Sequence, residues 1–204
     1  MTRWYTEHKN EHFYKEAKRL GYRARSAFKL KQIQRKFFII RRGDTVIDLG
    51  AAPGGWSQVA RELTGPLGCV ISVDISPMKP LEHVQCIQGD IAEPSTIDQI
   101  KHSLGSKGAD VVLSDMSPDI TGTYSVDQAR SIWLCERAFA VACDLLKPRG
   151  NFVCKIFEGE DMRRFIQTVK QRFSFVKMFS PEASRRSSSE VYLVAKSFNN
   201  GCHT

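Results

Sequence analysis

The chain has 204 residues, of which 42% are hydrophobic and 25% are charged. This composition excludes an intrinsically disordered chain, and the length favours one domain. The sequence has no apolar run near the roughly 18–20 residues that a membrane span needs, and its first residues are polar where a secretory signal would be apolar. We expect a cytoplasmic, monomeric protein that contacts no membrane.

Basic residues are concentrated at the start of the chain. The sequence holds 30 Lys and Arg against 22 Asp and Glu, a net charge of +8, and residues 1–43 alone contain 13 against 3. The remaining residues hold 17 against 19 and are nearly neutral. A second concentration of Lys and Arg lies between Arg163 and Arg186. Two basic segments that flank a ligand-binding core favour a polyanion such as RNA. The alternative is that each segment is a solvated helix face.

The first 43 residues are predicted to be helical, with a break at Gly21. After the break, Ala27 and Leu30 begin an apolar stripe at helical spacing, and basic residues lie between its members. We interpret residues 1–43 as a basic, helical, RNA-binding extension within one domain that covers residues 1–204.

From Thr45 onward, short β-branched runs alternate with amphipathic helical patterns. This alternation is typical of a mostly parallel sheet with helices on both faces, a doubly wound α/β fold. Only a turn-like loop separates the last two strands, and strands joined so closely pair antiparallel. We expect a seven-stranded catalytic core over residues 44–198. The strands are predicted at 45–49, 69–74, 84–88, 110–115, 151–157, 175–180 and 191–196. The helices of the core are predicted at 56–64, 95–104, 126–146 and 160–172.

The first strand ends in a glycine-rich segment, DLGAAPGGWS. It lacks the G-x-G-x-x-G pattern of dinucleotide-binding loops and the Lys-Ser/Thr of a phosphate-binding loop. Acids end the second strand and follow the third. Asp74 can accept hydrogen bonds from ribose hydroxyls, and Asp90 from an exocyclic amine. At the carboxyl ends of parallel strands this combination favours S-adenosylmethionine; the alternative is that the two acids cap turns. Further candidate contacts in the loop are Asp48, Gly50 and Pro53.

Four ionisable side chains are candidates for the chemistry. Lys155 lies in the apolar strand NFVCKIF, where an unpaired lysine is unfavourable; snorkelling at the strand end is the alternative explanation. Asp115 ends the fourth strand, Lys29 lies on the basic helix, and Glu190 begins the last strand. Burial or a second nearby cation favours the neutral form of a lysine, which can then act as a base near neutral pH. Two lysines and two acids that meet at strand ends would supply this arrangement.

The six cysteines form no C-x-x-C pair, and no histidine lies at metal-ligand spacing from them. Three of them lie in β-branched runs that are predicted to be strands. We therefore expect reduced thiols and no bound metal.

Longer motifs surround the candidate residues. They include YRARSAFKL, DLGAAPGGWSQV, SVDISPM, VLSDMSPDITG, FVCKIFEGE and SRRSSSEVYLVAK. Over residues 10–198 the chain resembles the FtsJ-type (RlmE) family of RNA 2′-O-ribose methyltransferases. The resemblance implies a Rossmann-like class I methyltransferase fold that uses S-adenosylmethionine. It also implies a catalytic tetrad at Lys29, Asp115, Lys155 and Glu190. The cofactor contacts that it implies are Gly54, Trp56, Asp74, Asp90 and Asp115.

We therefore predict an enzyme that methylates a ribose 2′-hydroxyl, with Lys155 as the base that takes the proton. The short chain is similar to the ribosomal RNA branch of the family, which implies a uridine in large-subunit ribosomal RNA as the target. Alternative substrates are the transfer RNA anticodon loop and the messenger RNA cap. A nicotinamide-dependent oxidoreductase is disfavoured by the missing G-x-G-x-x-G, and a non-catalytic RNA-binding assembly factor by the intact tetrad. The RNA contacts that we expect are Arg23, Arg25, Lys31, Arg185 and Arg186.

Overall fold

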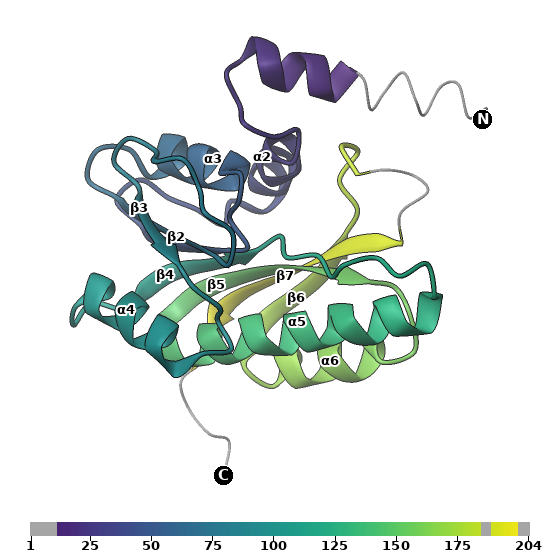
Figure 1. Cartoon of the computed structure of the whole chain (residues 1–204). Helices are drawn as coiled ribbons and strands as arrows, with labels where there is room; N and C mark the ends of the chain where they lie inside the picture. The colour runs from purple at the N-terminus through teal and green to yellow at the C-terminus, as the bar shows by residue number, and fades with distance from the viewer. Residues whose placement is uncertain (1–11, 185–188, 200–204) are drawn as a thin grey trace.

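A seven-stranded sheet forms the centre of the molecule (Figure 1). The computed structural model describes residues 12–184 and 189–199. The strand order is β3-β2-β1-β4-β5-β7-β6, so the chain builds outward from β1 to β3 and then continues on the other side of β1 with β4. Open α/β sheets bind ligands beside such a switch in strand order. The strands are β1 (Thr45–Leu49), β2 (Cys69–Asp74), β3 (Gln85–Gln88), β4 (Ala109–Ser114), β5 (Leu146–Phe157), β6 (Phe173–Phe179) and β7 (Glu190–Phe198).

The strands β1 to β5 pair in parallel, and β7 lies antiparallel between β5 and β6. The predicted fold, mostly parallel with an antiparallel last strand, is therefore confirmed. The connection from β6 to β7 is too short for a helical crossover, so β7 must run in the opposite direction. As a result, Glu190 at the start of β7 pairs with Phe157 at the end of β5, at the carboxyl edge of the parallel strands.

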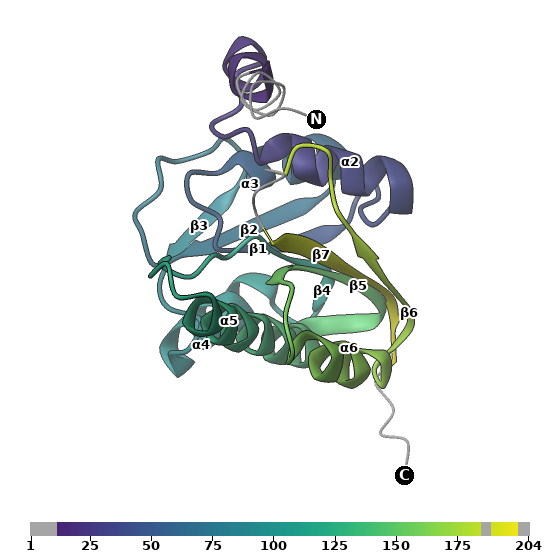
Figure 2. The ribbon, with the colours of Figure 1, turned by 90° about the vertical axis from the view of Figure 1, so that its right-hand side faces the viewer.

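Helices cover both faces of the sheet, α2 and α3 on one face and α4, α5 and α6 on the other (Figures 1 and 2). On β5, Val153 packs toward α2 and α3 and Cys154 packs toward the opposite helices. Because strand side chains alternate with a period of two, Lys155 lies on the same face as Val153. None of the described helices is long and apolar enough to cross a membrane. The helices are α2 (Ala27–Phe37), α3 (Gly55–Thr64), α4 (Pro94–Leu104), α5 (Tyr124–Leu145) and α6 (Met162–Lys170).

The helix α2 is part of the body of the domain. Its buried residues Ala27 and Leu30 belong to the same hydrophobic cluster as Trp56 and Val59 of α3. Of its basic residues, Lys29 is also buried, and Lys31, Arg35 and Lys36 lie at less buried positions. The apolar stripe predicted from the sequence thus packs against the core, and α2 shares its packing with residues 44–198.

The start of β5 differs from the prediction. The strand begins at Leu146, directly after α5 ends at Leu145, whereas the sequence predicted a start at Asn151. Leu146 pairs with Ala109, and the register shifts before Asn151 pairs with Val111. The residues between include proline and glycine, whose local preferences indicate a loop, so the early pairing could not be read from them.

The helices of the two basic segments lie on opposite faces of the sheet. The helix α2 belongs to the N-terminal segment, and α6, with Arg163 and Arg164, packs on the other face (Figure 2). A single flat RNA surface therefore does not include both helices.

Candidate active site

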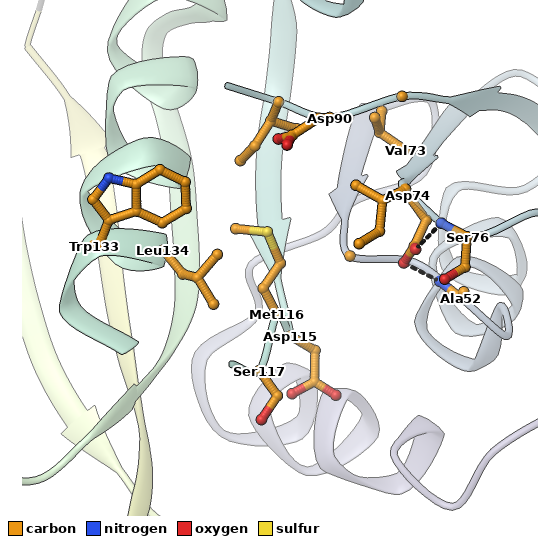
Figure 3. A pocket seen from close by; sticks show the side chains of 14 residues that line it. Ala52, Val73, Asp74, Ser76, Asp90, Asp115, Met116, Ser117, Trp133 and Leu134 are labelled. Carbon is orange, nitrogen blue, oxygen red and sulfur yellow. Dashed lines mark hydrogen bonds between the residues drawn. The ribbon is translucent and has the colours of Figure 1, made fainter. Parts of the chain in front are cut away.

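A cavity of about 450 Å³ opens at the carboxyl ends of the parallel strands (Figure 3). Four residues expected from the sequence to contact a cofactor line it: Gly50, Asp74, Asp90 and Asp115. The structure adds Trp133 of α5, which lies across the cavity from Asp74 in Figure 3. The remaining lining residues are Ala52, Val73, Ile75, Ser76, Gly89, Ile91, Met116, Ser117 and Leu134.

Asp74 joins the two loops that follow β1 and β2. Its Oδ2 accepts a hydrogen bond of 2.9 Å from the backbone N–H of Ala52, and its Oδ1 accepts one of 2.8 Å from Ser76. Each carboxylate oxygen can accept a second bond. The carboxylate of Asp90 similarly accepts a 2.8 Å bond from the N–H of Ala92. Both acids thus order their own loops, as the turn-capping alternative expected, and both still line the cavity.

Gly50 is required at the bend after β1. Its φ of 70° lies in the left-handed region, and a Cβ there would lie 2.4 Å from Cγ of Met116. Any side chain would therefore displace Met116, which lines the cavity. The glycine allows the backbone of this loop to approach the cavity closely.

Asp48 lies in β1 beneath α3 and is fully buried. Ser57 donates a 2.6 Å hydrogen bond to its Oδ2, and Ser72 donates to Ser57 at 2.7 Å. Its Oδ1 has no hydrogen-bond partner among the described residues. Burial, together with the nearby carboxylates of Asp115 and Asp74, raises the pKa of Asp48 to about 7 against the opposing effect of Ser57. Asp48 is not among the residues that line the cavity.

Three other residues that we expected to contact a cofactor, Pro53, Gly54 and Trp56, also fall outside the cavity lining. Trp56 is only 2% exposed. Its indole Nε1–H donates a 2.8 Å bond to the carbonyl of Ser26, and its ring centroid lies 5.6 Å from that of Tyr192. In this structure these residues support the loop and the adjacent core.

The four ionisable residues expected to act in catalysis form two buried ion pairs. Lys155 Nζ donates a 2.6 Å bond to the carbonyl of Asp115 and lies 3.3 Å from its carboxylate Oδ1. Lys29 Nζ lies 2.5 Å from Glu190 Oε1. All four side chains are 15% exposed or less. The structure therefore brings together residues from α2, β5, β7 and the end of β4.

Tyr192 connects the two pairs. It lies opposite Lys155 in the β5–β7 ladder, and its hydroxyl donates a 2.6 Å bond to Asp115 Oδ1. Lys29 Nζ lies 5.6 Å from the centre of its ring. Burial, reinforced by the carboxylates of Asp115 and Glu190, holds the pKa of Tyr192 well above its ordinary value, so the hydroxyl keeps its proton. Sequence reasoning missed Tyr192, although strand alternation places it on the same face as Glu190.

Burial acts to raise the pKa of Glu190, but the ammonium groups of Lys29 and Lys155 outweigh it. The net pKa of Glu190 therefore lies below its ordinary value. Glu190 is ionised at neutral pH and holds Lys29 as an ion pair.

Comparison with known proteins identifies the family. The model of the FtsJ-like methyltransferase family matches residues 22–198. The chain belongs to the FtsJ-like methyltransferase family. It is therefore a methyltransferase, as the motifs predicted, and the tetrad residues all lie within the matched region.

Curated relatives of this methyltransferase share about half of its residues. A protein of Halorubrum lacusprofundi is 50% identical over 191 residues, which cover 93% of this chain and 71% of the relative. A protein of Marinobacter nauticus is 48% identical over 196 residues, with 96% and 95% covered. Both are named ribosomal RNA large subunit methyltransferase E. A solved Plasmodium falciparum structure described as a ribosomal RNA methyltransferase superposes with a TM-score of 0.78 at 26% identity, covering 87% of this chain and 98% of that one.

The basic residues expected to contact RNA have different surroundings in this FtsJ-like methyltransferase. Lys31 pairs with Glu62 at 3.4 Å and lies 4.5 Å from the ring centre of Tyr22. Arg25 is half-buried, and its charge lowers the pKa of Tyr192, which lies beside the tetrad, against the larger effect of burial. Arg23 is half-buried and donates to backbone carbonyls. The other two expected contacts, Arg185 and Arg186, lie outside the described residues.

Proposed function

We propose that this methyltransferase transfers the methyl group of S-adenosylmethionine to a ribose 2′-hydroxyl of a uridine in large-subunit ribosomal RNA. The observation that carries the proposal is the meeting of Lys29, Asp115, Lys155 and Glu190 beside a cavity to which Asp115 itself contributes. The printed names of the relatives support ribosomal RNA as the substrate. A cytoplasmic location and the RNA-binding role of residues 1–43 belong to the same proposal.

The cavity residues fit S-adenosylmethionine. The volume of the cavity falls in the range of roughly 300–1,000 Å³ that is typical of small-molecule sites. Asp74 has acceptor capacity for two ribose hydroxyls, and Asp90 for an amine. Trp133 and Ile91 supply apolar surface for a purine. When bound, the cofactor supplies an electrophilic methyl group on a sulfonium centre.

Lys155 acts as the base in the proposed reaction. Asp115 holds its Nζ through a carbonyl and a carboxylate oxygen, which fixes the nitrogen at the border of the cavity. The ammonium of Lys155 would first give a proton to water. The free amine would then take the proton of the 2′-hydroxyl as the methyl group passes from sulfur to that oxygen, the carbon–sulfur bond breaking as the carbon–oxygen bond forms. Positioning of the reacting groups accounts for much of the acceleration, since correct orientation can supply roughly 7–11 kcal/mol.

Lys29 and Glu190 position the ribose beside Lys155. Their ion pair fixes both side chains. The ring of Tyr192 lies under Lys29 Nζ, and its hydroxyl holds the carboxylate of Asp115 in a single orientation. Arg25 and Lys31, close to this site on the N-terminal extension, contact the RNA backbone, together with Arg185 and Arg186. Phosphate contacts of this kind supply affinity without sequence preference.

The test offers labelled S-adenosylmethionine and the wild-type enzyme to large ribosomal subunits, free ribosomal RNA and transfer RNA in parallel. We expect label in large-subunit ribosomal RNA and none in transfer RNA. The matched control for a substitution of Lys155 is Lys147→Ala, because Lys147 lies on the same strand and pairs with Asp110 at 2.8 Å. The Lys147→Ala enzyme should transfer methyl groups at the wild-type rate. Label confined to transfer RNA would show that transfer RNA, and not ribosomal RNA, is the substrate.

A further inference from the structure

The side chain of Arg23 lies between two loops of the binding cavity. Its Nη1 donates hydrogen bonds to the carbonyls of Lys79 at 2.5 Å and Pro53 at 3.2 Å, and its Nη2 donates to Pro80 at 2.7 Å. Pro53 belongs to the loop after β1, and the other two acceptors belong to the loop after β2. One guanidinium therefore joins two loops that are separate in the sequence.

The same two loops carry the part of the cavity lining that surrounds Asp74. Ala52 lies in the first loop and Ser76 in the second, and Asp74 accepts hydrogen bonds from both backbone N–H groups. Arg23 is not among the lining residues, so it joins the loops from outside the cavity. Its side chain also fits closely against the first loop, since a Cβ on Gly54 would lie 3.2 Å from its Cδ and Nη1.

The backbone around Arg23 is fixed as well. The amide side chain of Gln58 on α3 accepts a 2.8 Å bond from the N–H of Arg23 and donates a 2.9 Å bond to the carbonyl of Gly21. The indole of Trp56 donates to the carbonyl of Ser26. The segment from Gly21 to Ser26 is thus tied to the start of α3, and Arg23 is held in place to bond the loops.

We propose that Arg23 is a positioning residue for the cofactor, because its guanidinium holds the two loops in the conformation that S-adenosylmethionine binds; the inference rests on the cofactor proposed above. This role differs from the phosphate contact that its basic surroundings predicted. A phosphate contact needs only positive charge, which lysine also supplies. The three carbonyls accept hydrogen bonds from two nitrogens that lie in one plane. Only a guanidinium presents its donors in this way, and a single ammonium group cannot replace it.

The variants Arg23→Lys and Arg23→Ala separate the two roles. Affinity for S-adenosylmethionine is measured by calorimetry, and affinity for large-subunit ribosomal RNA is measured as a function of salt. We expect both variants to weaken cofactor binding roughly tenfold, the effect of losing charge-assisted hydrogen bonds. The KM for the cofactor should rise as the affinity falls, and kcat at saturating cofactor should stay close to that of the wild type. Arg23→Lys keeps the RNA affinity and its salt dependence.

Arg35→Ala is the matched control, because Arg35 is an exposed cation in the last turn of α2. It removes the same charge from the same extension and should leave cofactor affinity unchanged. Wild-type cofactor affinity in Arg23→Lys would overturn the inference, as would a loss of RNA affinity in Arg23→Ala with cofactor affinity intact. Thermal unfolding shows whether each variant is folded, and if Arg23→Ala is not, Arg23→Lys decides. A wild-type protein that binds no S-adenosylmethionine would instead contradict the proposed function.

Discussion

The two faces of the sheet differ at the carboxyl ends of the central strands. Toward α4, α5 and α6 the strands present apolar residues such as Leu49 and Ile156. Toward α2 and α3 they present Asp48, Lys155 and Tyr192, all less than 10% exposed. Buried ionisable groups are unfavourable unless they are paired and hydrogen-bonded. Both faces carry a hydrophobic core, and the buried charges on the α2/α3 face are the ones to which we assign the chemistry.

Adjacent residues on β5 should therefore fail in different ways. Lys155→Met removes the proposed base and should lower the rate of methyl transfer by about 10²–10⁴-fold. The free energy of unfolding should also fall, by up to about 3–5 kcal/mol, because the variant leaves the largely buried carboxylate of Asp115 without its cation. Ile156→Val is the control on the opposite face and should lose about 0.5–1.5 kcal/mol of stability with an unchanged rate. Single-turnover experiments measure the rate of methyl transfer, and urea denaturation measures the free energy of unfolding, for each variant. Equal rates for the two variants would contradict the assignment.

A large residue of the apolar face should matter for stability alone. Phe152 is fully buried and packs against the rings of Phe139 and Phe173, at centroid distances of 6.0 and 6.2 Å. Phe152→Ala should lower the free energy of unfolding by about 3–5 kcal/mol, measured by urea denaturation. The folded variant should bind S-adenosylmethionine as the wild type does. A selective loss of cofactor affinity would show that this face also shapes the site.

Asp48 tests the polar face through its pH dependence. Because its pKa is raised to about 7 in the folded protein, the folded state keeps a proton that the unfolded state has lost from about pH 4 upward. Its contribution to stability is present below the unfolded pKa and is lost as the pH rises to 7, at about 1.4 kcal/mol per pH unit.

Asp48→Asn should lack this loss. The free energy of unfolding of the variant minus that of the wild type should grow from pH 4 to pH 7 and then level off. Denaturation at several pH values measures the difference. A difference that stays constant over this range would show that Asp48 is ionised in the folded protein.

The hydroxyl of Tyr192 should affect the rate less than Lys155 does. Tyr192→Phe removes its hydrogen bond to Asp115 and leaves the ring packed on Trp56. We expect kcat to fall roughly tenfold, the value of one hydrogen bond to a charged group. Tyr22→Phe is the control, because Tyr22 also donates to a carboxylate, that of Glu62, at 2.6 Å but on the surface. A similar fall in both variants would exclude a specific role in the tetrad.

The smallest effects are expected at surface ion pairs. Lys31 pairs with Glu62 beside the tetrad face, and Lys101 pairs with Asp144 at 2.8 Å on the opposite face. Replacing either lysine by alanine should change stability by about 0.2–1 kcal/mol. Lys31→Ala should also reduce the slope of log affinity for RNA against log salt by about one, and Lys101→Ala should not. Equal slopes in the two variants would remove Lys31 from the RNA surface.

The sequence was sufficient to predict the features that depend on local patterning. Strand alternation and the short link before Glu190 led to the sheet, its antiparallel last strand and the edge at which Lys155 and Asp115 meet. The tetrad came from the family motifs. Three of its residues lie at or near strand ends, which the sheet brings together, and Lys29 comes from α2.

Contacts that depend on loop paths could not be predicted. The bonds from Arg23 to Pro53 and Pro80 exist because two loops approach each other in space, and no periodicity encodes that approach. Trp133 falls within the helix predicted at 126–146 but was not singled out, because its place in the cavity depends on how α5 packs. Asp48 was expected in the cofactor site, but the alternation of β1 directs its side chain toward Ser57 of α3.

The identity of the methylated atom tests the central claim most directly. Large ribosomal subunits are incubated with labelled S-adenosylmethionine and either wild-type enzyme or Lys155→Met, and the RNA is hydrolysed with alkali. A 2′-O-methyl group blocks cleavage at the neighbouring phosphodiester, so we predict that the label from the wild type appears in an alkali-resistant dinucleotide and that the variant gives none. Label in single nucleotides would place the methyl group on a base and contradict the proposed reaction.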